Sequence, residues 1–492
     1  MVPEIRVQSC NQAPVNAGGM YVLYWMVAFR RTNWNFSLER AVEWAMELNK
    51  PLVIFEALRQ GHPWASDRVF RFVLDGMAEN MRRLRSKNAF YFPFVEPKPG
   101  AGGGLLAALA KRACVVVTDD FPCFVVPNMV EDAVRRLKVR LEKIDSNGLL
   151  PMRAASEVFK KVLDFRRFLH HALPFYLSEF IKPDPLVGRT LPKLGNLPAE
   201  IEQRWPPTNP KLLDEERFDL YQFPIDHSVP VLALQGGPQA GERTLNSFLE
   251  YRLQRFAERS TNPDKESTSG LSPYLHFGHL SVHQVFSQLV EREGWSLGQL
   301  SPQVTGSPRG WWGMSRNAEA FLDQLITWRE LGFNFCWRRP DYDQYESLPD
   351  WAKKTLAKHE TDPREHIYSL EKFEKAQTHD TLWNAAQTQL VREGRIHPYL
   401  RMLWGKKIVE WTTSPQEALA IMIELNNKHA IDGRNPNSYA GIFWTLGRYD
   451  RPWAPEQPIL GKVRGPSSES NVRKMKVRKY IEKYDSHSLA LF

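Results

Sequence analysis

Three tryptophans in the C-terminal part of the chain have a spacing that suits one-electron chemistry. Trp404 and Trp411 lie seven residues apart within 399–411, whose pattern predicts one helix. Two helical turns put both side chains on one face, about 10 Å apart along the axis. Trp383 opens the preceding predicted helix and can pack against them. Neighbouring indole rings that run from a buried redox cofactor to the surface would let single electrons hop without a metal.

The same spacing also fits a structural role. Aromatic residues at helical spacing pack into the seam of a hydrophobic core. Spacing alone favours this second interpretation, so the choice depends on the motifs around the tryptophans.

Several long motifs surround these residues and carry a family resemblance. They are HDTLWNAAQTQLVREGRIHPYLRMLWGKKIVEW at 379–411, LNNKHAIDGRNPNSYAGIFW at 425–444, DRPW at 450–453, STSGLSPYLHFG at 267–278 and, more loosely, YVLYWM at 21–26. The chain resembles the class II cyclobutane pyrimidine dimer DNA photolyases of the photolyase/cryptochrome family, over most of its length and in the same domain order. The resemblance implies a bent FAD in a helical domain. It also implies light-driven electron transfer from reduced flavin into a flipped-out dimer, which splits and returns the electron.

The resemblance assigns the cofactor site residue by residue. The residues that match the loop holding the FAD phosphates are Thr268, Ser269, Leu271 and Ser272. The alternative is that these hydroxyls only cap the N-terminus of an ordinary helix. Arg329 matches a flavin-contacting arginine. Asp432 and Gly433 match the turn at the isoalloxazine edge, and Asn426 matches the asparagine that faces flavin N5. Trp383, Trp404 and Trp411 coincide with the photoreduction chain of the family.

A second group of residues matches the DNA side of the family's site. Trp328, Met402 and Trp444 correspond to residues that pack against the flipped bases, where stacking surfaces are needed. Arg451 and Trp453 correspond to the loop pushed into the gap left in the duplex. Further contacts to DNA phosphates are expected from basic residues, namely Arg401, Lys406, Lys407 and the tail 473–483. The alternative is that these charged residues only form a solvent-exposed helix face.

Three positions depart from the family pattern. Gln324 stands where the family has a glutamate, and an amide can donate a hydrogen bond but not a proton. Phe256 replaces a phosphate-contacting tyrosine, and Asn435 replaces an aspartate. These departures support a second hypothesis, a cryptochrome-like photoreceptor or a photolyase-like flavoprotein with altered or lost repair. A third hypothesis is a non-catalytic nucleic-acid-binding helical protein.

The secondary-structure elements that must position these residues follow two different sequence patterns. Apolar runs at 21–29, 52–55, 89–94 and 114–118 predict strands, and amphipathic stretches at 37–48, 69–85, 105–111 and 130–144 predict helices. Continuous apolar strands between helices are typical of a parallel sheet covered on both faces. We therefore expect a doubly wound α/β domain over residues 1–173, with any ligand at the carboxyl ends of its strands. That domain could hold a deazaflavin-type antenna chromophore, for which no pocket residue can be assigned.

The second sequence pattern is helical. A proline-rich linker is predicted over residues 174–240, and an all-helical FAD-binding catalytic domain over 241–492. The helical pattern is clearest in five segments: 244–259, 317–331, 380–394, 398–411 and 414–429. The last opens with Ser-Pro-Gln-Glu, a capping box with proline at the first helical position.

Composition narrows the class of protein. Apolar residues make up 42% and charged residues 25%, which excludes a largely disordered or membrane-spanning chain. The formal net charge of +9 favours polyanionic partners, and DNA containing pyrimidine dimers is the expected one. The four cysteines form no CxxC, and no metal site is expected. The N-terminus lacks a signal-peptide core, so we expect a location in a bacterial-type cytoplasm, nucleoid-associated when the protein is bound to DNA. A monomer is the default expectation.

Overall fold

The computed structural model describes residues 1–178, 181–209, 213, 219–259, 262–265, 267–465 and 477–485. The chain divides into two compact units that interleave along the sequence. Unit 1 comprises residues 1–156, 172–246 and 270–297, and unit 2 comprises 157–171, 247–269 and 298–492. Each unit is described by itself.

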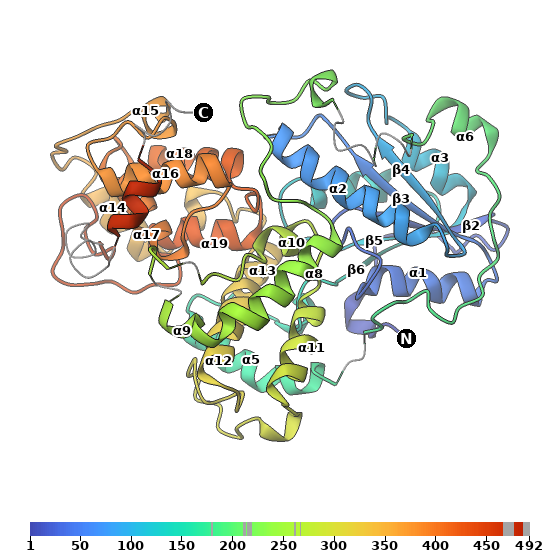
Figure 1. Ribbon diagram of the computed structural model, residues 1–492, viewed down its shortest axis with the longest axis horizontal. Helices are drawn as coiled ribbons and strands as arrows, with labels where there is room; N and C mark the ends of the chain where they lie inside the picture. The colour runs from blue at the N-terminus through green and yellow to red at the C-terminus, as the bar shows by residue number, and fades with distance from the viewer. Residues whose placement is uncertain are drawn as a thin grey trace. The chain divides into compact units, whose positions relative to one another are not determined.

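Unit 1 is built on a six-stranded sheet with the strand order β1-β6-β5-β2-β3-β4 (Figure 1). Its strands are β1 (Val7–Ser9), β2 (Tyr21–Met26), β3 (Leu52–Leu58), β4 (Ala89–Val95), β5 (Ala113–Asp119) and β6 (Leu141–Ile144). Neighbouring strands are parallel except for β1, which runs antiparallel to β6. The predicted α/β fold class is therefore confirmed.

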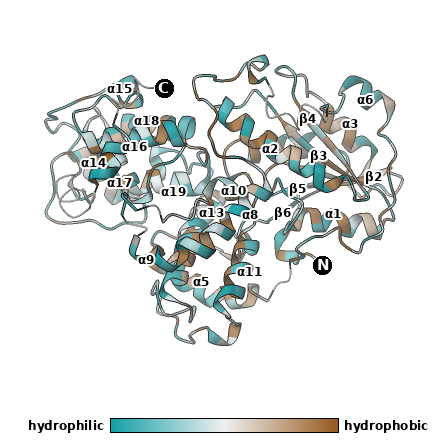
Figure 2. Cartoon of the chain, in the orientation of Figure 1, coloured by the Kyte–Doolittle hydropathy of each residue, from teal (hydrophilic) through white to brown (hydrophobic). Residues whose placement is uncertain are grey.

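Helices cover both faces of this sheet because alternate strand residues point to opposite sides. Tyr21, Leu23 and Trp25 share one buried cluster with residues of α3 (Leu105–Arg112) and α4 (Val126–Arg136). Val22, Tyr24 and Met26 share another with α1 (Phe36–Glu47), and α2 (Asp67–Leu84) contacts β3 and β4. In Figure 2 the strands are mostly hydrophobic, as expected for a sheet buried on both faces. The other helices and turns of unit 1 are η1 (Glu4–Arg6), η2 (Met152–Ala154), α6 (Ala199–Arg204), η3 (Leu220–Gln222), α8 (Pro238–Ser247), α10 (Ser272–His276) and α11 (Val282–Glu293).

The helix predicted over 130–144 is confirmed only as far as residue 136 and is wrong beyond it. The helix, α4, ends at Arg136, and Leu141–Ile144 is strand β6, which pairs with both β1 and β5. Leu141 and Ile144 are fully buried there. Backbone pairing on both sides of the strand therefore outweighed the helical periodicity of the segment.

Within its described residues unit 2 has helices and turns and no strand of a sheet, as predicted. They are α5 (Val162–Tyr176, whose last turn falls in unit 1), η4 (Phe248–Arg252), η5 (Leu253–Arg255), α9 (Phe256–Arg259), η6 (Leu297–Gln299), α12 (Arg316–Leu322), η7 (Asp323–Trp328), α13 (Arg329–Arg338), η8 (Tyr345–Ser347), α14 (Asp350–Lys358), α15 (Leu370–Glu374), α16 (Thr381–Glu393), α17 (Pro398–Glu410), α18 (Pro415–His429), α19 (Pro436–Thr445) and α21 (Arg478–Lys483).

Two predicted helices differ from the structure in an informative way. The segments 244–259 and 317–331 are helical but are interrupted by the π-helical turns η4 and η7. Such turns are rare and occur most often at functional sites, and η7 contains both Gln324 and Trp328. Only the N-cap half of the predicted capping box of α18 is confirmed: Ser414 Oγ accepts a hydrogen bond from the N–H of Glu417 at 3.1 Å. The Glu417 carboxylate accepts the N–H of Thr413 at 2.8 Å, one residue before the N-cap.

Among the described residues, no helix is long and apolar enough to cross a membrane. The same residues hold no group of three or more His, Cys, Asp or Glu side chains that could bind a metal ion.

Candidate functional site

The three predicted tryptophans meet on α16 and α17. Trp383 lies in the first turn of α16, where Asp380 caps the helix by accepting a hydrogen bond from its N–H at 2.9 Å. The Nε1 of Trp383 donates to the backbone oxygen of Trp404 at 2.9 Å. The Trp383 and Trp411 ring centroids are 5.9 Å apart, with the planes at 69°. Trp383 is therefore the middle member of a contact chain from Trp404 to Trp411.

This chain is dry along its length. The exposed fractions are 0% for Trp383, 2% for Trp404 and 5% for Trp411. Trp404 Nε1 donates to Gln387 Oε1 at 2.9 Å, so its polar atom is satisfied away from water. At the other end, the Trp411 ring contacts the partly exposed Tyr368 and the exposed His379, with centroid distances of 5.7 and 4.9 Å. The tryptophans are thus brought together as predicted, and their use in electron transfer stays a prediction.

Asn426 and Gly433 also lie together, where the chain turns back after α18. Asn426 is 4% exposed, and its Nδ2 donates to Asn427 Oδ1 at 3.2 Å. A Cβ on Gly433 would lie 2.8 Å from the backbone oxygen of Asn426, so only glycine fits. Asp432, in the same turn, is 8% exposed.

Asn427 and Arg434 hold this turn, and the sequence analysis did not identify them. Asn427 Oδ1 accepts the N–H of Arg434 at 2.9 Å, and the Arg434 guanidinium donates to the Asn427 backbone oxygen. Burial lowers the pKa of Arg434 to about 10. An arginine directly after the Asp432-Gly433 pair was the available signal.

Asn435 has a structural role that an aspartate would fill equally well. It is the N-cap of α19, where its Oδ1 accepts the N–H of Asn437 at 2.9 Å. Asparagine and aspartate are almost equal as N-caps. This departure from the family pattern therefore leaves the local fold intact.

Two of the predicted base-packing residues stack on each other. The rings of Trp328, at the end of η7, and Trp444, in α19, lie 4.5 Å apart at 21°. Both are half-buried, as is Met402 in α17, whereas Gln324 is exposed. Arg329, next to Trp328, is 8% exposed and lies 4.3 Å above the ring of Phe333.

The DRPW loop has a braced tryptophan. Trp453 Nε1 donates to Asp450 Oδ1 at 3.0 Å. The guanidinium groups of Arg451 and Arg464 lie 4.8 and 4.9 Å from its ring centroid. Trp453 N also donates to the Lys462 backbone oxygen at 2.9 Å, which closes the loop. This loop presents cations and an aromatic ring together.

The predicted phosphate loop lies across the division between the two units. Thr268 and Ser269 belong to unit 2, and Leu271 and Ser272 to unit 1, where they begin α10. In unit 2 two arginines hold Thr268: Arg252 Nη1 donates to its backbone oxygen at 2.9 Å and Arg395 Nη1 to its hydroxyl at 3.4 Å. The adjacent Ser267 is 2% exposed, and its hydroxyl has no hydrogen-bond partner among the described residues. Cations beside a buried unpaired donor fit a phosphate group.

Phe256, which replaces the family's phosphate-contacting tyrosine, and the basic residues predicted to contact phosphates differ in exposure. Phe256 is 2% exposed and packs edge-on against Phe248 and Phe321. Lys406 is also 2% exposed, so the expectation of a surface phosphate contact there is wrong. Residues 473–476 of the basic tail lie outside the described residues, and 478–483 form α21. Arg401 is partly exposed, and Lys407 pairs with Glu410 at 2.6 Å.

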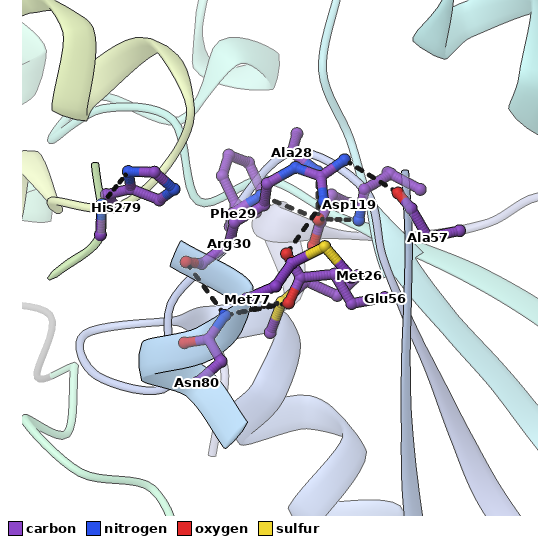
Figure 3. A network of polar contacts seen from close by, with 12 residues as sticks. Met26, Ala28, Phe29, Arg30, Glu56, Ala57, Met77, Asn80, Asp119 and His279 are labelled. Atoms are coloured by element: carbon purple, nitrogen blue, oxygen red, sulfur yellow. Dashed lines mark hydrogen bonds and ion pairs between the residues drawn. The ribbon is translucent and has the colours of Figure 1, made fainter. Parts of the chain in front are cut away.

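The carboxyl ends of the sheet strands in unit 1 carry a charged hydrogen-bond network (Figure 3). Asp119, at the end of β5, accepts hydrogen bonds from the backbone N–H groups of residues 27, 28 and 29 at 2.7–2.9 Å. Glu56, in β3, pairs with Arg30 at 2.9 Å and accepts from Asn80 and Tyr91 at 3.0 and 2.7 Å. These contacts fix the loop after β2. The antenna chromophore predicted for this domain stays a prediction.

Comparisons with known proteins show which family the chain resembles over its whole length. The chain is 33% identical to the deoxyribodipyrimidine photo-lyase of Methanothermobacter thermautotrophicus over 483 residues, which is 98% of each chain. It is 34% identical to the enzyme of that name from Arabidopsis thaliana over 471 residues, 94% of this chain and 88% of the relative. No family model matches the chain.

Solved structures support the fold. A class III photolyase from Agrobacterium tumefaciens aligns over 95% of this chain and 86% of its own, with a TM-score of 0.63 at 15% identity. A cryptochrome from Synechocystis aligns over 94% and 88%, with the same TM-score and identity. Because a third of the residues are shared with photo-lyases over nearly the whole length, the chain belongs to the deoxyribodipyrimidine photo-lyase family, within the photolyase and cryptochrome fold.

Proposed function

We propose that this chain is a light-driven, FAD-dependent enzyme of the class II type that repairs cyclobutane pyrimidine dimers in DNA. The observation that carries the proposal is the buried contact chain Trp404–Trp383–Trp411. Its members are the three that the family resemblance assigns to photoreduction. A line of buried tryptophans in contact with one another is suited to refilling a buried electron donor.

The cofactor site would use residues on both the phosphate and the ring side of FAD. Thr268 and Ser269 would hold the phosphates, which is supported by the two arginines on Thr268 and by the unpaired hydroxyl of Ser267. Arg329, Asn426 and the turn at Asp432 and Gly433 would contact the isoalloxazine. FAD, when bound, supplies the light-absorbing one-electron donor. The Asn426 amide can donate to or accept from the ring edge, and so serves either protonation state.

The substrate side would use the aromatic pair. Trp328 and Trp444 stack on each other, and extruded bases would pack against the outer faces of this pair, with Met402 as a flexible apolar side chain of the same site. Arg451 and Trp453 would enter the gap in the duplex. The bracing of Trp453 between two guanidinium groups supports this role, because a preformed wedge loses less entropy on binding.

Repair of a defined substrate tests the proposal. The reduced protein is illuminated with an oligonucleotide that contains one thymine dimer, and restored thymines are counted by chromatography. We expect many turnovers per protein, and no restoration would refute the assignment. A Trp411→Phe variant separates photoreduction from repair. It should block light-driven reduction of the oxidised protein but leave repair intact after chemical reduction, because only the refilling path is cut.

Gln324 favours one alternative, a cryptochrome-like photoreceptor or a photolyase-like flavoprotein with altered or lost repair. Gln324 is exposed on η7, four residues before Trp328, and its amide can hydrogen-bond to a reduced pyrimidine but cannot protonate it. If repair is limited by this residue, Gln324→Glu should raise the yield. Light-driven flavin reduction without any repair would favour the photoreceptor. Robust repair that Gln324→Glu does not improve would exclude it.

A further inference from the structure

The C-terminal helix α21 is fastened to α16 by two buried tyrosines. Tyr480 and Tyr484 are 3% and 4% exposed. The Tyr480 hydroxyl donates to Gln389 Oε1 at 2.7 Å, Gln389 Nε2 donates to the Tyr484 hydroxyl at 3.2 Å, and that hydroxyl donates to Glu393 Oε1 at 2.6 Å. Buried networks with satisfied partners hold one geometry. The short helix is therefore rigidly placed.

Helix α21 makes two more polar contacts, one at each end. The N–H of Tyr480 donates to Asp264 Oδ1 at 2.8 Å, three residues before Ser267. Lys483 Nζ lies 3.1 Å from Glu393 Oε1. The helix thus joins the C-terminal end of α16 to the segment that leads into the predicted phosphate loop.

Glu393, which contacts α21, also forms an ion pair with Arg395. Its Oε2 lies 3.1 Å from Arg395 Nε and 3.0 Å from Nη2. Burial alone would raise the pKa of Glu393, but the hydrogen bond from Tyr484 and the charges of Arg395 and Lys483 outweigh it and lower the pKa. The carboxylate is therefore ionised at neutral pH, and its pairing with Arg395 is charge-assisted. The remaining Nη1 of Arg395 is the atom that reaches the hydroxyl of Thr268, at 3.4 Å.

The end of this chain of contacts has the features of an anion site. Thr268 is held on its backbone oxygen by Arg252 and on its hydroxyl by Arg395. Next to it, the Ser267 hydroxyl is buried and has no hydrogen-bond partner in the described part of the chain. A buried hydroxyl without a partner costs free energy unless a ligand completes it. A phosphate oxygen would complete it.

We propose that α21, Glu393 and Arg395 form a latch that positions the Thr268 loop for the diphosphate of FAD, so that the C-terminal helix controls how long the flavin is retained. This inference rests on the proposed function, because it requires FAD. Glu393 and Arg395 are positioning residues: Glu393 orients the guanidinium, and the guanidinium orients Thr268.

Release of flavin from the full-length holoenzyme tests the latch. Free flavin is followed by its fluorescence after dilution of the wild type and of the Tyr480→Phe, Tyr484→Phe double variant. The double variant loses three hydrogen bonds, and we expect release at least about 10-fold faster. Lys479→Ala, at an exposed position of the same helix, is the matched control and should release flavin at the wild-type rate.

A charge rescue separates positioning from general loosening. Arg395→Met should release flavin faster than wild type, and Arg395→Lys should recover part of the retention because the cation remains beside Thr268. If both variants release flavin equally fast, or if the tyrosine variant matches the wild type, the latch is refuted. Should the tyrosine variant fail to fold, Glu393→Gln tests the same link, and unchanged release there also refutes it. A wild-type protein that binds no flavin would instead overturn the proposed function, and this inference with it.

Discussion

The buried amine of Lys406 should make the stability of the protein depend on pH. The side chain is 2% exposed, and burial lowers its pKa from 10.5 to about 7; Arg464 adds to the decrease, and Asp450 opposes it. The change Lys406→Met removes the amine and keeps an unbranched side chain of similar length. In the unfolded chain the amine keeps its ordinary pKa.

The magnitude follows from the two pKa values. A difference of about 3.5 units corresponds to about 5 kcal/mol of preference for the neutral amine in the folded state. Between about pH 7 and pH 10 the unfolded chain binds more protons, so the wild-type free energy of unfolding rises with pH across this window. Below pH 7 the amine is protonated in both the folded and the unfolded chain, so the folded state carries the full free-energy cost of burying the charge. Lys406→Met should therefore be more stable than wild type at pH 6, by up to about 5 kcal/mol, and should lose this advantage near pH 10.

Thermal unfolding at the two pH values measures this effect. At about 2–4 °C per kcal/mol for a unit of this size, we expect Tm to rise by about 10 °C at pH 6 and to change little at pH 10. Lys407→Met is the control, since Lys407 is partly exposed and pairs with Glu410 at 2.6 Å. Its effect should be small and equal at both pH values. An increase for Lys406→Met that is the same at pH 6 and pH 10, or a loss at pH 6, would refute the reasoning.

Three further predictions concern packing, a buried acceptor and DNA. Gly76→Ala should lower the stability of unit 1 by about 1–3 kcal/mol in calorimetry, because the added Cβ would lie 2.4 Å from His279 Nε2; an unchanged Tm would mean that the histidine moves freely. Asp119→Ala should cost about 3 kcal/mol or more by urea unfolding, since three backbone N–H groups lose their acceptor, and a loss below about 1 kcal/mol would show that water replaces it. Arg451→Ala should weaken binding of dimer-containing DNA and reduce the salt slope by about 1, whereas an unchanged slope would place Arg451 away from the phosphates.

Much of the fold of unit 1 was predictable from local pattern. Strands β2, β3, β4 and β5 overlap the predicted apolar runs, because a strand buried on both faces is mostly apolar. The exceptions are polar groups with buried partners near the carboxyl ends, such as Glu56 in β3 and Asp119 in β5. Strand β6 was not predictable in this way. Its four residues follow α4 without a break in the apolar pattern, and only pairing with β1 and β5 makes them extended. The π-helical turns η4 and η7 are likewise invisible to a search for helical periodicity.

The sequence by itself, through its resemblance to photolyases, determined which residues are assigned to the candidate site: the three indoles, the Asp-Gly turn and the hydroxyls of the Thr268 loop. Only the tertiary structure decided how they connect. It put Trp383 between Trp404 and Trp411, and it buried Lys406 although its neighbour Lys407 stays partly exposed. It also joined Tyr484 to Thr268 through Glu393 and Arg395. Contacts between segments far apart in the chain depend on how helices pack, and no local pattern encodes that packing.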